Sequence, residues 1–378
     1  MKKRNIKFGD LLISDQSKRL IKKALDENWV SGGHLIKQLE KEWGKIFGYK
    51  YNVAMSNGAD ADTAACLALY DFGAKRGDEI IVPALAFASV GSSILAAGFT
   101  PVFVDIERET LNINPAKIEE KISSKTVAIM VVHTMGKPCD MDAVQNIAKK
   151  HNLKIIEDCC EAHGAQYRKK FVGQFGEAAA FSFYVAHVLA GGDGGMCSTN
   201  NPKMEEVLRS LKDHGRKSGS LYFDHVRNGS NFRMNILPAA VMLGEIKNFW
   251  KVFKKRKENL NYLLNKTADL GDVAFFNREE SYEVTSPHAF SVTLKDPKYN
   301  YKKLYDFLQD NLVQCKRNFG SMPTQHKAFA FLGHKVGEFP AAEYVGSNGL
   351  HIGVHHHLSR KDLDYVSSLL HIYFEKYA

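Results

Sequence analysis

The chain has 378 residues, of which 44% are hydrophobic and 25% are charged, and its formal net charge at pH 7 is +9. These ordinary proportions exclude an intrinsically disordered chain, a collagen-like repeat and a disulfide-rich miniprotein, and the length predicts two packed domains. The positive charge suits a polyanionic partner, either a nucleic acid or a nucleotide-linked substrate, and does not decide between the two.

Neither export nor membrane insertion is indicated. The basic residues at 1–5 are not followed by an apolar run, and no uncharged apolar segment reaches the roughly 18 residues that span a bilayer. We therefore expect a cytoplasmic protein without a membrane anchor. Six cysteines in so long a chain predict free thiols, and because no pair has C-x-x-C spacing, we expect no structural zinc.

The first two-thirds of the chain alternate helical and strand-like segments. Helical patterns cover residues 35–40, just after Gly32-Gly33, and then 61–72 and 141–150. Short apolar runs of strand length lie at 51–55, 79–83, 101–105, 127–132, 154–158 and 178–184. This alternation predicts βαβ units around a mainly parallel sheet.

The last third has a different pattern. A long helical segment from Asn235 to Lys266 predicts a connector between two lobes, and we interpret its basic cluster at 251–257 as a solvated helix face rather than a site for an acidic partner. A strand at 289–294, a helix at 301–312 and a closing helix from about Lys361 predict a smaller α+β domain. The expected domains are residues 1–250 and 251–378.

Polar residues follow several predicted strands, where ligands of open parallel sheets bind. The segment Ser56-Asn57-Gly58-Ala59 joins a strand to a helix, and a helix N-terminus attracts phosphate, although any tight strand–helix turn has a similar sequence. Asp158 ends a very apolar run and needs hydrogen-bond donors or a cation there. A pyridinium nitrogen, an arginine and a metal each fit, as does a simple cap of the following turn.

A third strand ends at 181–184, before a histidine and a glycine-rich segment. Ser182 could donate to a phosphate, and the glycines at 191–195 suit either a turn beside a ligand or a hairpin. His187 taken alone fits a structural role as well as a catalytic one.

In their order and spacing, these segments resemble the nucleotide-sugar aminotransferase and dehydratase family, the DegT family. The resemblance runs from about Trp29 to the C-terminus and is carried by segments at 56–59, 77–83, 101–105, 133–136, 156–165, 181–183, 213–216 and 229–234, together with Phe87. It implies the aspartate-aminotransferase fold (fold type I), an α/β fold whose large domain has a mainly parallel seven-stranded sheet. It also implies bound pyridoxal phosphate and a homodimer with shared active sites.

The resemblance assigns a role to each residue around the cofactor. The phosphate would be held by Gly58, Ala59 and Ser182, and by Asn231 of the neighbouring subunit. Around the ring, Phe87 would stack on it, Asp158 would hold its nitrogen protonated and Glu161 would lie beside it. The same resemblance implies a nucleotide-linked sugar as substrate and no nucleic acid.

One residue departs from the aminotransferases of this family. Their Schiff-base lysine corresponds to His187, and no lysine occurs anywhere from 171 to 202. Imidazole cannot form a Schiff base but can move protons near neutral pH. This substitution resembles the 3-dehydratase branch, as do residues 157–160, although Val188 stands where that branch often has a second histidine.

The branch implies a specific activity. Its enzymes use pyridoxamine phosphate to remove the 3-hydroxyl of a nucleotide-linked 4-keto-6-deoxyhexose, with the histidine as acid and base. Only Cys197 and Cys315 follow His187, too few for the iron–sulfur cluster of one type, so the resemblance favours the metal-free type that regenerates pyridoxamine phosphate from L-glutamate. A sugar aminotransferase whose lysine has been replaced, naturally or by engineering, and a catalytically silent ligand-binding member are the alternatives.

Three further residues are candidate contacts for the substrate. Tyr184 could touch the sugar or simply pack, and Arg317 could bind a phosphate or be solvated. His355, one of three adjacent histidines, could line the pocket. We expect no metal there because neighbouring residues on a strand point to opposite faces.

Overall fold

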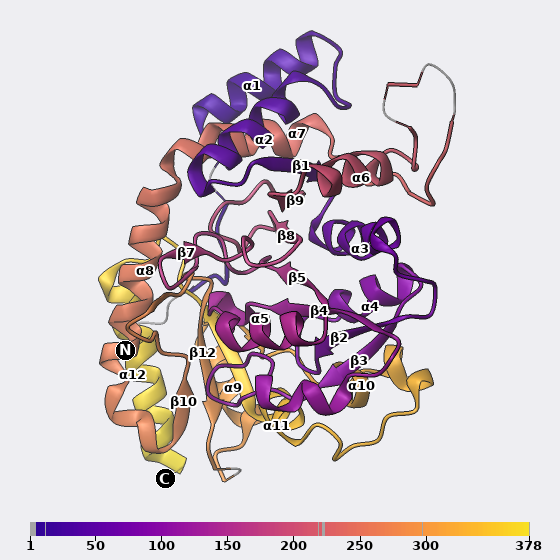
Figure 1. Cartoon of the computed structure of the whole chain (residues 1–378). Helices are drawn as coiled ribbons and strands as arrows, with labels where there is room; N and C mark the ends of the chain where they lie inside the picture. The colour runs from indigo at the N-terminus through magenta and orange to yellow at the C-terminus, as the bar shows by residue number, and fades with distance from the viewer. Residues whose placement is uncertain (1–4, 12, 218, 221–223, 297, 378) are drawn as a thin grey trace.

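The largest sheet of the protein has seven strands in the order β1-β9-β8-β5-β4-β2-β3 (Figure 1). The computed structural model describes residues 5–11, 13–217, 219–220, 224–296 and 298–377. The strands of this sheet are β1 (Tyr51–Met55), β2 (Glu79–Pro83), β3 (Thr100–Val104), β4 (Thr126–Val132), β5 (Lys154–Asp158), β8 (Ala178–Ser182) and β9 (Gly195–Thr199). Only β9 runs opposite to the other six strands, so the prediction of a mainly parallel, seven-stranded sheet is confirmed.

Helices cover both faces of this sheet, and its strands are accordingly apolar on both sides. Successive residues of β5 show this, because Ile155 and Ile156 belong to two different clusters of buried side chains. The α-helices of this domain are α1 (Asp15–Asp26), α2 (His34–Phe47), α3 (Gly58–Ala68), α4 (Ser89–Ala96), α5 (Met141–Lys150), α6 (Pro202–Lys212) and α7 (Ile236–Glu245).

A second, antiparallel sheet forms the smaller domain, with strand order β10-β12-β14-β13. Its strands are β10 (Ala274–Phe276), β12 (Ala289–Leu294), β13 (Cys315–Arg317) and β14 (Gly349–Gly353). Its helices are α8 (Phe249–Lys266), α9 (Tyr301–Asp310), α10 (Met322–Gln325), α11 (Pro340–Asn348) and α12 (Arg360–Tyr377). The long helices α8 and α12 run side by side along one edge of the molecule (Figure 1).

Short elements complete the fold. A small sheet contains β6 (Gln166–Tyr167), β7 (Lys170–Phe171) and β11 (Glu283–Val284). The 3-10 turns are η1 (Leu69–Phe72), η2 (Pro115–Lys117), η3 (Glu119–Lys121), η4 (Thr134–Gly136), η5 (Ile246–Asn248), η6 (Ala268–Asp272) and η7 (Lys327–Leu332). No helix in the described ranges is long and apolar enough to cross a membrane.

Two predicted elements differ from the structure. The strand expected at 178–184 ends at Ser182, and the single helix expected from Asn235 is divided by η5 into α7 and α8. This break lets α7 pack on α1 and α2, while α8 continues into the smaller domain against α12. The three histidines at 355–357 follow the end of β14 in an irregular turn, so the strand geometry assumed for them is wrong.

The two domains are joined by more than α8. The buried carboxylate of Asp105, just after β3, accepts the backbone N–H groups of Ala341 (3.1 Å) and Ala342 (2.9 Å) in the first turn of α11. The N-terminal segment also bridges them, since Ile6 pairs with Val313 of the smaller domain. A few residues later Gly9 lies so close to Ala186 that an added Cβ would stand 3.1 Å from the Ala186 Cα.

Candidate active site

The candidate site begins where β1, β5 and β8 end at the same edge of the sheet. Gly58 opens α3 directly after β1, and a Cβ added to it would lie 2.7 Å from the Ser182 Cβ and 2.9 Å from the Cys160 Sγ. Because Gly58 has no side chain, the segments that follow β1, β5 and β8 can lie in close contact. Asn57 caps α3 by accepting the Asp60 N–H at 2.8 Å, so the start of the helix, with Ala59 in its first turn, faces this edge as an anion site requires.

Two buried carboxyl groups lie beside this convergence. Asp158 ends β5, and Asp62 reaches it from α3; oxygens of both and the Cys160 Sγ all lie within 4.8 Å of one another. Burial raises the pKa of both carboxyl groups, and the charge of Asp158 raises that of Asp62 further. The sequence analysis did not identify Asp62, because its contact with Asp158 depends on the tertiary fold.

The surroundings of Asp158 fit the expected cofactor. Its Oδ1 accepts the Cys160 N–H at 2.9 Å, so it does cap the following turn. Among the described residues, no lysine or arginine forms an ion pair with it, and Asp62 Oδ1 has no hydrogen-bond partner. A protonated pyridine nitrogen would supply the missing cation. Gly58 and Ala59 begin α3 close to Ser182, and the binding of a phosphate by these three residues stays a prediction.

His187 lies in the turn after β8 and is partly buried. Its ring centroid is 5.6 Å from that of His163, 5.3 Å from that of His288 and 6.1 Å from that of Tyr184. Burial and then the charges of His288, His163, Arg256 and Lys316 lower the pKa of His187 well below its ordinary value. The ring is therefore neutral at pH 7, and its Nδ1 has no hydrogen-bond partner in the described chain.

His288 comes from the smaller domain and is held by a predicted cofactor residue. Its Nε2 lies 3.0 Å from Oε1 of Glu161, whose other oxygen accepts the Met135 N–H at 2.7 Å. Burial opposes ionisation of Glu161, but the electrostatic effect and hydrogen bond of His288, together with His351 and the Met135 N–H, outweigh it and lower the Glu161 pKa. Nothing in the local sequence singled out His288, since it only precedes an ordinary strand.

The three candidate substrate residues lie at different positions relative to His187. Tyr184 is exposed near His187, and the Nζ of Lys316 lies 5.2 Å from the centre of its ring. Arg317, the next residue of β13, instead donates to the Gly346 carbonyl, because neighbouring strand residues face opposite sides. His355 is buried in the turn after β14, and no described contact joins it to the His187 ring.

Two predicted cofactor residues stand further out. Phe87 is 63% exposed and contacts only the ring of Phe319 among described aromatic residues, at 6.2 Å between centroids. The exposed Asn231 accepts a hydrogen bond from Nε of Arg233 at 2.9 Å. The carbonyl of its neighbour Phe232 accepts the Ser56 N–H at 2.8 Å, which places the Asn231 segment beside the turn between β1 and α3.

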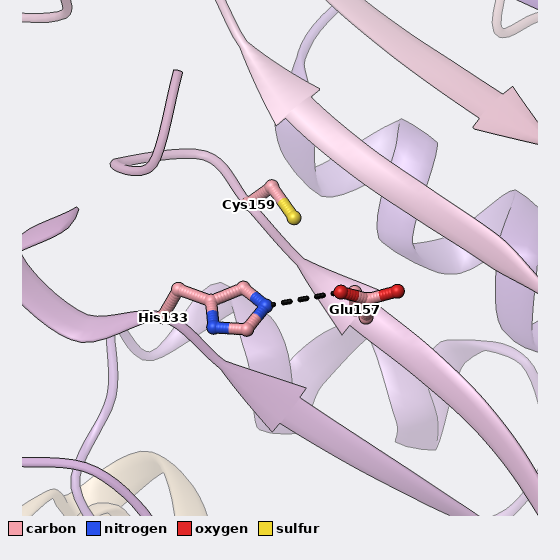
Figure 2. A group of neighbouring side chains, drawn as sticks. All are labelled: His133, Glu157 and Cys159. Carbon is pink, nitrogen blue, oxygen red and sulfur yellow. Dashed lines mark hydrogen bonds and ion pairs between the residues drawn. The ribbon is translucent and has the colours of Figure 1, made fainter. Parts of the chain in front are cut away.

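His133, Glu157 and Cys159 form a second buried group at the same sheet edge (Figure 2). Glu157 accepts N–H groups of Gly173 (2.6 Å), Phe175 (2.7 Å) and Gly176 (2.7 Å). His133 Nδ1 accepts the Cys139 N–H, so its Nε2 carries the proton and donates to Glu157 at 3.2 Å. These bonds occupy the ring nitrogens of His133 and the carboxylate of Glu157, and they hold the β5 edge in place.

Comparison with known proteins identifies one family. The model of the DegT/DnrJ/EryC1/StrS aminotransferase family matches residues 12–371. The chain is 30% identical to GDP-perosamine synthase of Escherichia coli O157:H7 over 96% of each chain. It superposes on E. coli GDP-4-keto-6-deoxy-D-mannose-3-dehydratase with bound hydrated PLP with a TM-score of 0.89 and 26% identity, covering 98% of this chain and 100% of the other. A GDP-4-keto-6-deoxymannose-3-dehydratase with a trapped PLP-glutamate geminal diamine gives 0.88 and 26%, covering 97% and 100%.

Proposed function

This chain belongs to the DegT/DnrJ/EryC1/StrS aminotransferase family, and on that basis we propose that it is a 3-dehydratase acting on a nucleotide-linked 4-keto-6-deoxyhexose. The coarser description is direct: it is a pyridoxal-phosphate-dependent enzyme of fold type I that works on nucleotide sugars. Homodimeric assembly, L-glutamate as the amino donor and a cytoplasmic location belong to the proposal.

The residue at position 187 carries the proposal. A histidine stands there, its Nδ1 is unpartnered, and burial together with the surrounding charges lowers its pKa, so the neutral ring keeps a free lone pair for acid–base chemistry. The sequence from 171 to 202 holds no lysine that could replace it as a Schiff-base residue. Acid–base catalysis without a covalent lysine is the chemistry that this position supports.

The other residues act by holding and orienting. When bound, the cofactor supplies an amine and an electron sink. Gly58, Ala59 and Ser182 would hold its phosphate, with Asn231 contributed to the neighbouring subunit, and Asp158 would keep its ring nitrogen protonated. Phe87 and Glu161 would lie against the ring, and Tyr184 would face the sugar. His187 Nδ1 would take up one proton and release it again.

A sugar aminotransferase is the second candidate, favoured by the name of a relative that is 30% identical. Lys316 gives this alternative a physical basis, since its amine lies 5.2 Å from the centre of the Tyr184 ring. It belongs to the smaller domain, on β13, and not to the strand that ends at Ser182.

The deciding experiment is mass spectrometry of GDP- and CDP-linked 4-keto-6-deoxyhexoses after incubation with the protein, pyridoxal phosphate and ¹⁵N-glutamate. Loss of one oxygen without nitrogen in the sugar supports dehydration, and release of 2-oxoglutarate identifies glutamate as the donor. A sugar that gains ¹⁵N in place of its keto oxygen rules out the dehydratase proposal.

Variants assign the chemistry to residues. His187→Asn should abolish deoxygenation, whereas the control His151→Asn, just after α5, should not change it. Lys316→Met should still form the deoxygenated sugar. His187→Lys should shift the product towards the amino sugar. Activity retained by His187→Asn and lost by Lys316→Met would instead favour the aminotransferase.

A further inference from the structure

Arg256 is buried inside a segment whose sequence suggested a solvated face. It lies on α8 among lysines, yet only 2% of it is exposed, while Lys254 on the same helix is exposed. Burial lowers the pKa of Arg256 to about 10, which leaves it charged at neutral pH. The expectation that the whole 251–257 cluster is solvated is therefore wrong at this residue.

Backbone carbonyl oxygens accept the hydrogen bonds of this guanidinium. Its Nη2 donates to the Ala186 carbonyl at 2.8 Å and to the His288 carbonyl at 2.9 Å. Its Nη1 donates to the His187 carbonyl at 3.2 Å, and its Nε to the Pro287 carbonyl at 3.0 Å. None of the ion pairs within the described ranges includes Arg256, so a permanent charge is buried without a carboxylate.

These four carbonyls come from two different domains. Residues 186 and 187 belong to the turn after β8 in the large domain, and residues 287 and 288 precede β12 in the smaller one. The planar guanidinium, with its fixed fork of donors, therefore ties together the two segments that carry His187 and His288. Their rings stand 5.3 Å apart, centre to centre.

We propose that Arg256 is a positioning residue that fixes His187 against His288 across the domain junction. The proposal rests on the proposed role of His187 as acid and base. The charge of Arg256 has a second effect there, because it disfavours a proton on the neighbouring imidazole. The groups facing His187 are His163 from the loop after β5, His288 with its partner Glu161, Lys316 of β13, Tyr184 of the same turn and Arg256 itself.

The test compares Arg256→Lys, which keeps the charge, with Arg256→Gln, which keeps amide donors but removes the charge. The His187 resonance is followed by NMR titration of the ¹⁵N-histidine-labelled holoenzyme and assigned with His187→Asn. We expect Arg256→Gln to titrate His187 at a higher pH than wild type and Arg256→Lys to leave the midpoint close to wild type. Arg209→Lys and Arg209→Gln are the matched controls. Arg209 also lies on a helix, but its guanidinium pairs with the carboxylates of Glu40 and Glu205.

Turnover provides the second measurement. Both Arg256 variants should lose about ten- to a hundredfold in kcat with KM nearly unchanged, since a misplaced acid–base group slows the proton transfer rather than substrate binding. Wild-type kcat in Arg256→Lys would overturn the positioning role, even if Arg256→Gln fails to fold. An unmoved His187 midpoint in a folded Arg256→Gln overturns the electrostatic effect. Because the titration does not use the sugar, it remains decisive if the dehydratase proposal fails.

Discussion

At the scale of single residues, the candidate site places two carboxyl groups together in the buried interior. Asp62 and Asp158 share one buried space, and the side-chain pairing that normally offsets such burial is missing from Asp62 Oδ1. Two such groups cannot both ionise without a large cost, so one of them holds a proton until a cation arrives. This arrangement would favour the positively charged ring nitrogen of the proposed cofactor position.

The raised pKa of Asp62 makes stability depend on pH in a definite direction. A carboxyl group whose folded pKa exceeds its unfolded value stabilises the fold below the unfolded pKa, and this contribution is lost as the pH rises through the folded pKa. Asp62→Asn should therefore match wild type in acid and exceed it at pH 8 by about 1 kcal/mol or more in cofactor-free protein. Urea unfolding from pH 4.5 to 8 measures this, with the exposed Asp26→Asn as control; parallel curves for wild type and Asp62→Asn would refute it.

Glu157 is a structural carboxylate of the opposite kind, because every part of it is bonded. Glu157→Gln replaces a charged acceptor of three N–H groups by a neutral amide whose NH₂ faces donors. We expect a loss of about 2–4 kcal/mol in the free energy of unfolding. Thermal and urea unfolding test this, with Glu177→Gln, a change at a partly exposed glutamate just before β8, as the comparison. Added zinc or a chelator should change neither protein.

At the scale of secondary-structure elements, α3 contributes both its capped N-terminus and a missing side chain. Gly58→Ala would bring a methyl group within 2.9 Å of Ser182 and Cys160. Both neighbours belong to packed segments at the strand ends, so we expect pyridoxal phosphate binding, measured by absorbance titration, to weaken tenfold or more. We also expect the free energy of unfolding to fall by about 1–3 kcal/mol. Gly271→Ala, whose added methyl group meets no atom within 4 Å, is the control; equal affinities would contradict this role for Gly58.

The elements were more predictable than their contacts. Short apolar runs separated by helices predicted the parallel strands, because burial on both faces imposes that composition locally. The antiparallel β9 was not identified, since its five residues follow a glycine-rich stretch without an alternating pattern. Asp62, His288 and Arg256 escaped prediction for a different reason: their environment is set by segments from other parts of the chain, such as the carbonyls around Arg256.

At the scale of the whole molecule, the two domains are held by polar bonds at several separate points. Asp105 receives two N–H groups from the first turn of α11 and an ion pair from Lys117 at 3.3 Å. A carboxylate at a helix N-terminus is favoured by the helix dipole. The site lies between such links, with His187 on one domain and His288 on the other.

Asp105→Asn should loosen this junction without disturbing either core. Losing the charge and one acceptor oxygen should lower the free energy of unfolding by about 1–2 kcal/mol. Hydrogen exchange should accelerate at the amides of α11 and β14 before those of β4 and β5. The control is Asp142→Asn on the exposed side of α5; unchanged exchange in α11 would show that the junction does not depend on Asp105.

The N-terminal segment imposes an order on folding during synthesis. The Phe8 N–H donates to the side chain of Gln314, 306 positions further along the chain, and Ile6 pairs with Val313. At typical translation rates these partners follow after roughly 15–60 s, so the segment waits unpaired while the large domain forms. Gly9 of this segment packs on the turn that carries His187. The residues that cover this turn are therefore synthesised first, but they reach their final position only after residues 313 and 314 have been made.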